Sequence, residues 1–373
     1  MDTAVNKLSS RHTGIDILRI VLMLQILFLH ISLHGGLTDV ALEKGGRFEL
    51  VYWIIWITCR CPVYVFIMIT GYYLSSTDFP INKKRIVKVY LPMLFYSIMI
   101  RVVYGIMRPG ALNYKQYIKA LFPFVSKHWY FMTLYLLLIV LAPFLNNAVR
   151  SLTRTRFLIL LGVCFFLFSI MQPLSKLEPF SFYVHINHIV NTDTGKSLYD
   201  FIFMYLVGAY LRRYRILVKD ERSDHKTIWD SPWVYLGMFF ICVILNLILV
   251  YHYPDKNIIN VLIYNDNPVT VIQGICLFRI FENIRLERFP KVGEVAQFIS
   301  KGMLGIYMIQ EHPNTREVIW KELFNVRDLT VKGGLKFFIL VFGIVVLVFS
   351  VLWLIDLVGR RVFERIIRLQ KTL

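Results

Sequence analysis

Two polar side chains share one face of the first long apolar segment of the chain. The run RHTGIDILRIVLMLQILFLH contains Arg19 and His30 in an Arg-x10-His spacing. In an α-helix this spacing places the two side chains within about 20° of one another and about 16 Å apart along the axis. Imidazole is the side chain best suited to proton transfer near neutral pH, and guanidinium binds anionic oxygen groups. We therefore predict that this face touches both aqueous compartments and that His30 takes part in proton transfer; the alternative for His30 is a core histidine whose two nitrogens have partners.

A second histidine, His34, lies one helical turn beyond His30 on the same side. Two histidines at this spacing can ligate a metal ion, but no carboxylate or cysteine motif on the same segment completes a metal site. We therefore expect no metal cofactor, and we predict that His34 contacts a substrate.

The composition indicates that these residues lie in a membrane protein. Hydrophobic residues make up 57% of the 373 residues, and charged residues make up only 18%. A spanning helix needs about 20 mostly apolar residues, and about ten runs approach this length. They predict an all-α, polytopic helical bundle that forms a single domain over residues 1–373. The runs cover residues 14–33, 50–74, 86–106, 128–149, 157–172, 198–211, 233–251, 268–281, 295–310 and 335–358.

The basic residues predict the orientation of these helices. With both termini in the cytoplasm, the cytoplasmic segments hold nearly twice as many Lys and Arg residues as the opposite segments. Short loops with excess positive charge stay on the cytoplasmic side. The net charge of +18 is therefore explained mainly by topology. No motif or soluble domain supports a nucleic-acid partner.

Further cations fall in or beside the predicted spans. Arg85 and Lys88 open the third run, and Lys301 lies about two turns into the ninth. Cations at such positions suit the phosphates of a nucleotide carrier, and solvated topogenic charge is the alternative for each of them and for Arg19. Arg60 falls in the middle of the second run, where a charge needs a buried partner, and we predict that it binds substrate.

On the outer side, His128 and Trp129 begin the fourth run, and Glu311 and His312 follow the ninth. A carboxylate can orient or stabilise a catalytic imidazole, so Glu311 is a second catalytic candidate. We predict that His128, Trp129 and His312 contact the acceptor substrate. The alternatives are an interfacial aromatic belt for Trp129 and a solvated loop pair for Glu311 and His312.

Several segments, in order, resemble the acyltransferase-3 family of integral membrane O-acyltransferases. The opening run with its Arg-x10-His spacing is followed by CPVYVFIMITGYYL, KKRIVKVYLPML, HWYFMTLYLLLIVLAPFLN, FIFMYLVGAYLRRY and KGMLGIYMIQEHP. The resemblance covers essentially the whole chain. It implies transfer of an acyl group, usually acetyl, from cytoplasmic acyl-CoA to a hydroxyl of an extracytoplasmic glycan or polysaccharide. It also implies a multi-pass protein of the cell membrane, and we expect a bacterial plasma membrane.

The resemblance implies that His30 is the catalytic base or carries the acyl group, with Arg19 as its partner toward the donor. Two positions depart from the family pattern. The Arg-x-x-Arg element is Arg85-x-x-Lys88, which keeps the charge but loses one bidentate group. The late motif that ends in His ends here in Gln310, so any role of that His is lost or passes to Glu311 or His312.

Two rival functions fit a chain with intramembrane charges. One is a transporter or flippase of a glycan or lipid-linked intermediate, which discontinuous helices and an inverted repeat would favour. We find neither in the sequence. The other is a membrane-embedded sensor or assembly subunit with no chemistry of its own.

Overall fold

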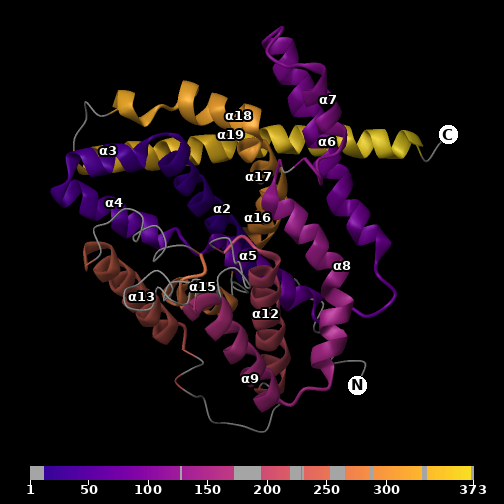
Figure 1. Cartoon of the computed structure of the whole chain (residues 1–373), viewed down its shortest axis with the longest axis vertical. Coiled ribbons are helices and arrows are strands. Elements are labelled where there is room, and N and C mark those ends of the chain that lie inside the picture. Colours follow the sequence, from indigo (N-terminus) through magenta and orange to yellow (C-terminus); the bar gives the residue numbers. More distant parts are fainter. Residues whose placement is uncertain are drawn as a thin grey trace.

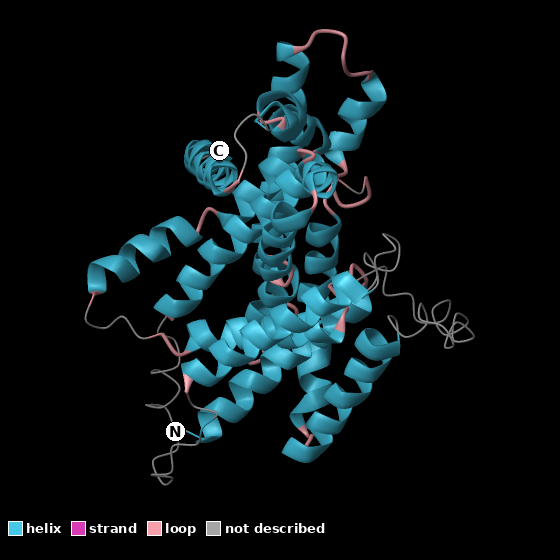
Figure 2. Ribbon diagram, turned by 90° about the vertical axis from the view of Figure 1, so that its left-hand side faces the viewer, coloured by secondary structure: helices cyan, strands magenta, loops and turns pink. Residues whose placement is uncertain are grey.

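The structure is a computed structural model that describes residues 12–126, 128–171, 195–218, 228, 231–252, 265–284, 289–329 and 334–370. Every regular element among these residues is a helix (Figures 1 and 2), which confirms the all-α prediction. The α-helices are α2 (Thr13–His34), α3 (Leu37–Lys44), α4 (Gly46–Thr58), α5 (Pro62–Leu74), α6 (Lys83–Met107), α7 (Tyr114–Leu121), α8 (Tyr130–Arg150), α9 (Arg154–Phe165), α12 (Leu198–Val218), α13 (Pro232–His252), α15 (Pro268–Glu282), α16 (Pro290–Ser300), α17 (Met303–Glu311), α18 (Pro313–Glu317) and α19 (Leu335–Gln370). Short π-helices follow α9 (η1, Phe166–Ile170) and α18 (η4, Val318–Leu323), and a 3₁₀ turn, η5 (Val326–Leu329), precedes α19.

Six segments of the described chain are long and apolar enough to cross a membrane. They are Thr13–His34, Gly46–Leu74, Lys83–Met107, Tyr130–Arg150, Pro232–His252 and Lys336–Arg365. This confirms a multi-pass membrane protein, while the count of about ten spans and the cytoplasmic termini stay predictions. The four other predicted runs also form helices, namely α9 with η1, α12, α15, and α16 with α17, although residue 172 lies outside the described residues.

Helix α2 lies in the middle of the bundle (Figure 1). It packs against α5, α15, α16 and α19, which are far apart in the sequence. Ile15, Leu18 and Leu22 recur at helical spacing and are completely buried. Because four neighbouring helices hold α2 in place, the stripe beside this buried face also has a fixed direction.

Helices α5 and α12 approach closely because both carry a glycine at the contact. A Cβ atom on Gly71 would collide with the backbone of Tyr205, and one on Gly208 would collide with the backbone of Met68. Small residues are typical of closely packed membrane helices, where backbone packing replaces the hydrophobic effect. The contact holds α5, which in turn packs against α2.

The second apolar run is broken in its middle, so the expectation that no helix is discontinuous is wrong. Helix α4 ends at Thr58 and α5 begins at Pro62, with Arg60 in the break. Pro62 has no backbone N–H to donate to the carbonyl of Thr58, four residues earlier, and its ring would clash with that carbonyl, so the helix cannot continue through this point. Two buried glutamines donate to carbonyls at the end of α4: Gln25 to Thr58 O at 3.0 Å, and Gln273 to Ile57 O at 3.0 Å.

A second break separates α16 from α17 at Lys301 and Gly302. Here the long helix α19 packs so closely that a Cβ atom on Gly302 would crowd Trp353 and Asp356. Asp356 is buried and accepts hydrogen bonds from Tyr96 of α6 at 2.7 Å and from Arg360 at 2.6 Å. These contacts tie α6, α17 and α19 together.

Candidate active site

A cavity of about 640 Å³ lies beside α2. The lining residues on this helix include Arg19, Met23, Ile26, His30 and Leu33, which follow one another at steps of three and four residues. They form one stripe, as the helical period requires. Arg19 and His30 therefore line the same cavity from its two ends, as the Arg-x10-His spacing predicts. Other walls come from α5, α8 and the α16–α17 segment.

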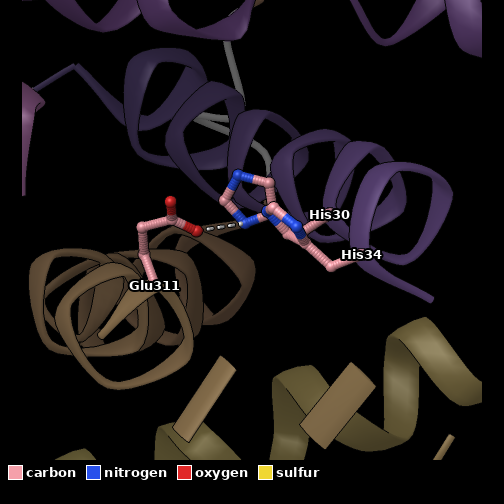
Figure 3. Close-up of side chains that lie close together, drawn as sticks. All are labelled: His30, His34 and Glu311. Carbon is pink, nitrogen blue, oxygen red and sulfur yellow. Dashed lines mark ion pairs between the residues drawn. The ribbon is translucent and has the colours of Figure 1, made fainter. Parts of the chain in front are cut away.

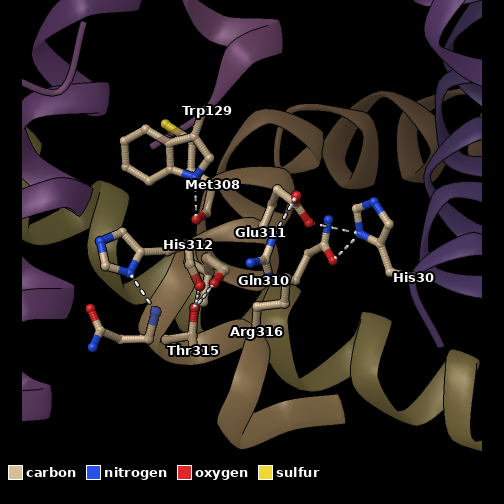
Figure 4. A network of polar contacts seen from close by, with 10 residues as sticks. His30, Trp129, Met308, Gln310, Glu311, His312, Thr315 and Arg316 are labelled. Carbon is tan, nitrogen blue, oxygen red and sulfur yellow. Dashed lines mark hydrogen bonds and ion pairs between the residues drawn. The ribbon is translucent and has the colours of Figure 1, made fainter. Parts of the chain in front are cut away.

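At one end of the cavity, His30 meets the C-terminal end of α17 (Figure 4). Nδ1 of His30 lies 2.6 Å from Oε1 of Gln310 and 3.2 Å from Oε2 of Glu311. The other carboxylate oxygen of Glu311 lies 3.3 Å from the guanidinium of Arg316. The site thus combines an imidazole, an amide oxygen and a carboxylate whose charge is shared with an arginine.

His34 stands beside this group, one turn further along α2 (Figure 3). The rings of His30 and His34 have their centroids 5.5 Å apart. One ligand atom from each of His30, His34 and Glu311 lies within 4.8 Å of the other two. All three side chains are partly exposed to the cavity.

At the other end, Arg19 pairs with Asp16 on its own helix at 2.9 Å. Asp16 is buried and also accepts a hydrogen bond from Ser300 at the end of α16, at 2.8 Å. The guanidinium of Arg19 lies over the ring of Tyr73, 5.6 Å from its centroid. Lys301, which follows Ser300 in the sequence, lines the cavity and is exposed. Two cations thus stand at this end, one held rigidly by Asp16.

The chain was compared with known protein families. A family model, described as an acyltransferase domain of the acyltransferase-3 family, matches residues 12–357. The chain belongs to the acyltransferase-3 family. It is therefore a membrane acyltransferase, as the sequence predicts. No curated protein and no solved structure matches the chain.

Arg60 of this acyltransferase lines the cavity from the break between α4 and α5. Its side chain is buried, and its guanidinium lies 4.7 Å from the centroid of the Trp56 ring. A cation over an aromatic face is stabilised by the ring quadrupole. Arg60 thus brings a cation to the cavity wall at the point where the second apolar run is interrupted.

Two of the predicted donor-binding cations do not line the cavity. Arg85 and Lys88 lie in the first two turns of α6, which Asn82 caps by accepting from the Arg85 N–H at 3.2 Å. Lys88 is exposed and Arg85 is half-buried. The residue of this turn that reaches the cavity is Val89. The sequence could not indicate which face of α6 is turned inward.

His128, Trp129 and His312 form a separate buried cluster that does not line the cavity. The ring of His312 lies 5.2 Å from His128 and 5.6 Å from Trp129. Trp129 donates to the carbonyl of Met308 in α17 at 3.0 Å, as Figure 4 shows. This acyltransferase therefore uses the cluster to hold the end of α17, directly behind Gln310 and Glu311.

The charged residue beside this cluster is Arg101 of α6, and its side chain is only 5% exposed. Its guanidinium lies 2.9 Å from Nε2 of His128. Burial and the nearby cation Arg101 lower the pKa of His312 to about 2, so His312 is neutral at pH 7. Its Nδ1 accepts from the N–H of Asn314 at 3.3 Å.

Sequence reasoning missed Gln310, Arg316 and Arg101. A signal existed for Arg101, because it is a charge inside an apolar run and such charges mark functional or structural sites. Gln310 was visible only as a departure from the family motif. For Arg316 no spacing rule applies, because its contact with Glu311 depends on the turn between α17 and α18.

Proposed function

We propose that this membrane acyltransferase transfers an acyl group, acetyl in the first instance, from cytoplasmic acyl-CoA to a hydroxyl of an extracytoplasmic glycan. The observation that carries the proposal is the single cavity lined by Arg19 and Lys301 at one end and by His30 and Glu311 at the other. The stripe from Arg19 to His30 extends for about 16 Å. An extended pantetheine arm would follow this stripe, with its thioester beside His30.

The donor end would bind the phosphates of acyl-CoA. Arg19 offers a rigid guanidinium, because Asp16 and the Tyr73 ring fix its position. Lys301 adds an exposed ammonium next to it. Guanidinium and ammonium groups together suit a diphosphate. In this proposal Arg85 and Lys88 attract the nucleotide portion to the cytoplasmic surface without lining the cavity.

The base would be Nε2 of His30. Oε1 of Gln310 and Oε2 of Glu311 both face Nδ1, and a carboxylate can only accept a hydrogen bond. We assign the proton of neutral His30 to Nδ1 on the basis of these two partners. Its Nε2 lone pair is then available to an acceptor hydroxyl.

In the reaction, Nε2 of His30 removes the proton from the acceptor hydroxyl as its oxygen attacks the thioester carbonyl carbon. A C–O bond forms, the C–S bond breaks, and the CoA thiolate takes up the proton from the imidazolium. Glu311 stabilises the imidazolium between these two proton transfers, as a carboxylate does for other histidine bases. An acyl-histidine formed on Nε2 is the alternative route.

The acceptor would approach through the end of the cavity that holds His34. His34 and Arg60 both line the cavity and offer hydrogen bonds to sugar hydroxyls. Tyr130 and Tyr307 add aromatic surface on the opposite wall. In this proposal His128, Trp129 and His312 act on the acceptor indirectly, by holding the end of α17.

Radiolabel transfer tests the proposal. Membranes that contain the protein are incubated with acetyl-CoA labelled in the acetyl group, and label is measured on the isolated surface glycan. We expect label with the wild type and a loss of at least 100-fold in His30→Ala, because general-base catalysis contributes about 10²–10⁴-fold. His252→Ala is the control, because His252 is exposed at the end of α13 and does not line the cavity.

A transporter or flippase is the second candidate, because the break between α4 and α5 at Arg60 is a feature of transport proteins. The same assay separates the two functions. Movement of a glycan intermediate across the membrane without incorporation of label would favour transport. Full label transfer by His30→Ala would refute the catalytic role of His30.

A further inference from the structure

Three metal-binding side chains converge where α2 meets the end of α17. His30 and His34 are four residues apart on α2, so their rings project from one side of the helix (Figure 3). Glu311 approaches from α17, and one ligand atom of each residue lies within 4.8 Å of the others. Oε2 of Glu311 is buried and lies 3.2 Å from Nδ1 of His30.

This donor set has a definite metal preference. Two imidazoles and one carboxylate, with a fourth position open to water, are a ligand set typical of Zn²⁺. Zinc binds such ligands at about 2.0–2.2 Å, so the donor atoms of a tetrahedral site lie about 3.4 Å apart. A shift of roughly 1 Å in the side chains would bring the three donors to this spacing. Mg²⁺ and Ca²⁺ prefer oxygen ligands and fit poorly.

We propose that His30, His34 and Glu311 bind Zn²⁺ and that bound zinc switches the acyltransferase off. The inhibitory part rests on the proposed function, because it requires His30 to act as the base. Zinc bound to Nε2 of His30 would use the lone pair that the base needs. Zinc bound to Nδ1 would move the ring proton to Nε2, which then has no free lone pair. The metal also occupies the end of the cavity through which the acceptor would enter.

The surrounding charges make this binding reversible. Arg316 lies 3.3 Å from the other oxygen of Glu311, and Lys196 lines the same cavity. Both cations oppose a divalent ion in a medium of low dielectric. The site would therefore fill when zinc is abundant and empty when it is chelated, as an inhibitory site requires.

Direct binding tests the site without any substrate. Tag-free protein in detergent is treated with a chelator, desalted and titrated with ZnCl₂ in a calorimeter, with MgCl₂ as the control metal. We expect one zinc ion per chain and at least a tenfold loss of affinity in His34→Ala and in Glu311→Gln. His252→Ala should bind zinc like the wild type. Absence of binding, or unchanged affinity in both ligand variants, would overturn the proposal.

Acyl transfer tests the inhibition separately. We expect the chelator-treated wild type to be fully active, to lose activity as ZnCl₂ is added and to recover with excess chelator. Activity that needs zinc would overturn the inhibitory role and indicate a catalytic metal instead. If the wild type transfers no acyl group at all, the proposed function fails, while the calorimetric result still decides whether the zinc site exists.

Discussion

The amide oxygen of Gln310 lies 2.6 Å from Nδ1 of His30, across the contact between α17 and α2. Gln310 is completely buried, so this contact excludes water from one side of the imidazole. The neighbouring Glu311 faces the same nitrogen at 3.2 Å. Gln310 thus holds the orientation of the ring, and Glu311 supplies the charge.

The first prediction concerns this orientation. Gln310→Leu removes the amide oxygen at similar volume, and we expect kcat to fall about fivefold, since a hydrogen bond contributes about 1 kcal/mol and 1.4 kcal/mol is a factor of ten. KM for acyl-CoA should stay within about twofold, because Gln310 does not line the cavity. Steady-state kinetics over a range of pH measure kcat and KM for acyl-CoA.

Gln310→His, which restores the usual family residue, should retain more activity than Gln310→Leu. Equal kcat in Gln310→Leu and the wild type would exclude a positioning role.

The second prediction concerns the donor end. Lys301→Glu reverses an exposed charge beside Arg19, and we expect KM for acyl-CoA to rise at least tenfold, because a charged hydrogen bond contributes about 1.5–3 kcal/mol. The effect should shrink at high salt. Lys291→Glu is the matched control, because Lys291 is exposed in the first turn of α16, the helix that ends just before Lys301, and does not line the cavity. A KM that rises equally in both variants would indicate a general effect of surface charge.

The third prediction concerns stability. Asp356→Ala leaves Tyr96 without its acceptor and Arg360 without its ion pair. We expect the unfolding free energy to fall by about 2–3 kcal/mol, because buried hydrogen-bonding groups lose their partners. Thermal unfolding in detergent measures this as a lower Tm. KM for acyl-CoA in the folded fraction should not change, since Asp356 does not line the cavity. An unchanged Tm would mean that α6 and α19 are held together by apolar packing alone.

The fourth prediction concerns pH. Burial lowers the pKa of His312 to about 2, against about 6.5 in the unfolded chain. Between these values the unfolded state binds the proton and the folded state does not, so stability is lost as pH falls below about 6.5. This one group would contribute roughly 1.4 kcal/mol for each pH unit in that range.

Unfolding of the wild type and of His312→Asn, followed in detergent between pH 7 and pH 5, checks this prediction. We expect a shallower decline of stability in the variant, because asparagine does not titrate there. Parallel declines would show that other groups set the acid sensitivity.

Periodicity in the sequence predicted the central geometry of the cavity. The positions of Arg19 and His30 on one stripe follow from the helical period alone, and the structure has both in the cavity wall. The break at Arg60 was also encoded, because Pro62 disfavours a continuous helix, but the unbroken apolar run 50–74 concealed it. A hydropathy profile identifies a long apolar segment, but it does not show whether the helix in that segment is continuous.

The other features in and around the site depend on contacts between segments that are distant in the chain. Nothing near Lys88 indicates that Val89 is the residue of that turn which faces the cavity. The cluster of His128 and His312 joins α8 to the end of α17, and its separation from the cavity depends on how these helices pack. Such contacts follow from tertiary packing, for which a single sequence offers no spacing rule.

In the proposed function, the position of Arg60 bears on how well the membrane retains its ion gradients. Any passage by which an acyl group crosses a bilayer is also a potential leak for protons and metal ions. A fixed guanidinium partway along such a passage repels small cations, as arginine does in channels that conduct water but exclude protons. In the proposed function, the interrupted helix that brings Arg60 to the cavity wall would thus let the cavity admit a pantetheine arm while small cations are repelled and the membrane potential is preserved.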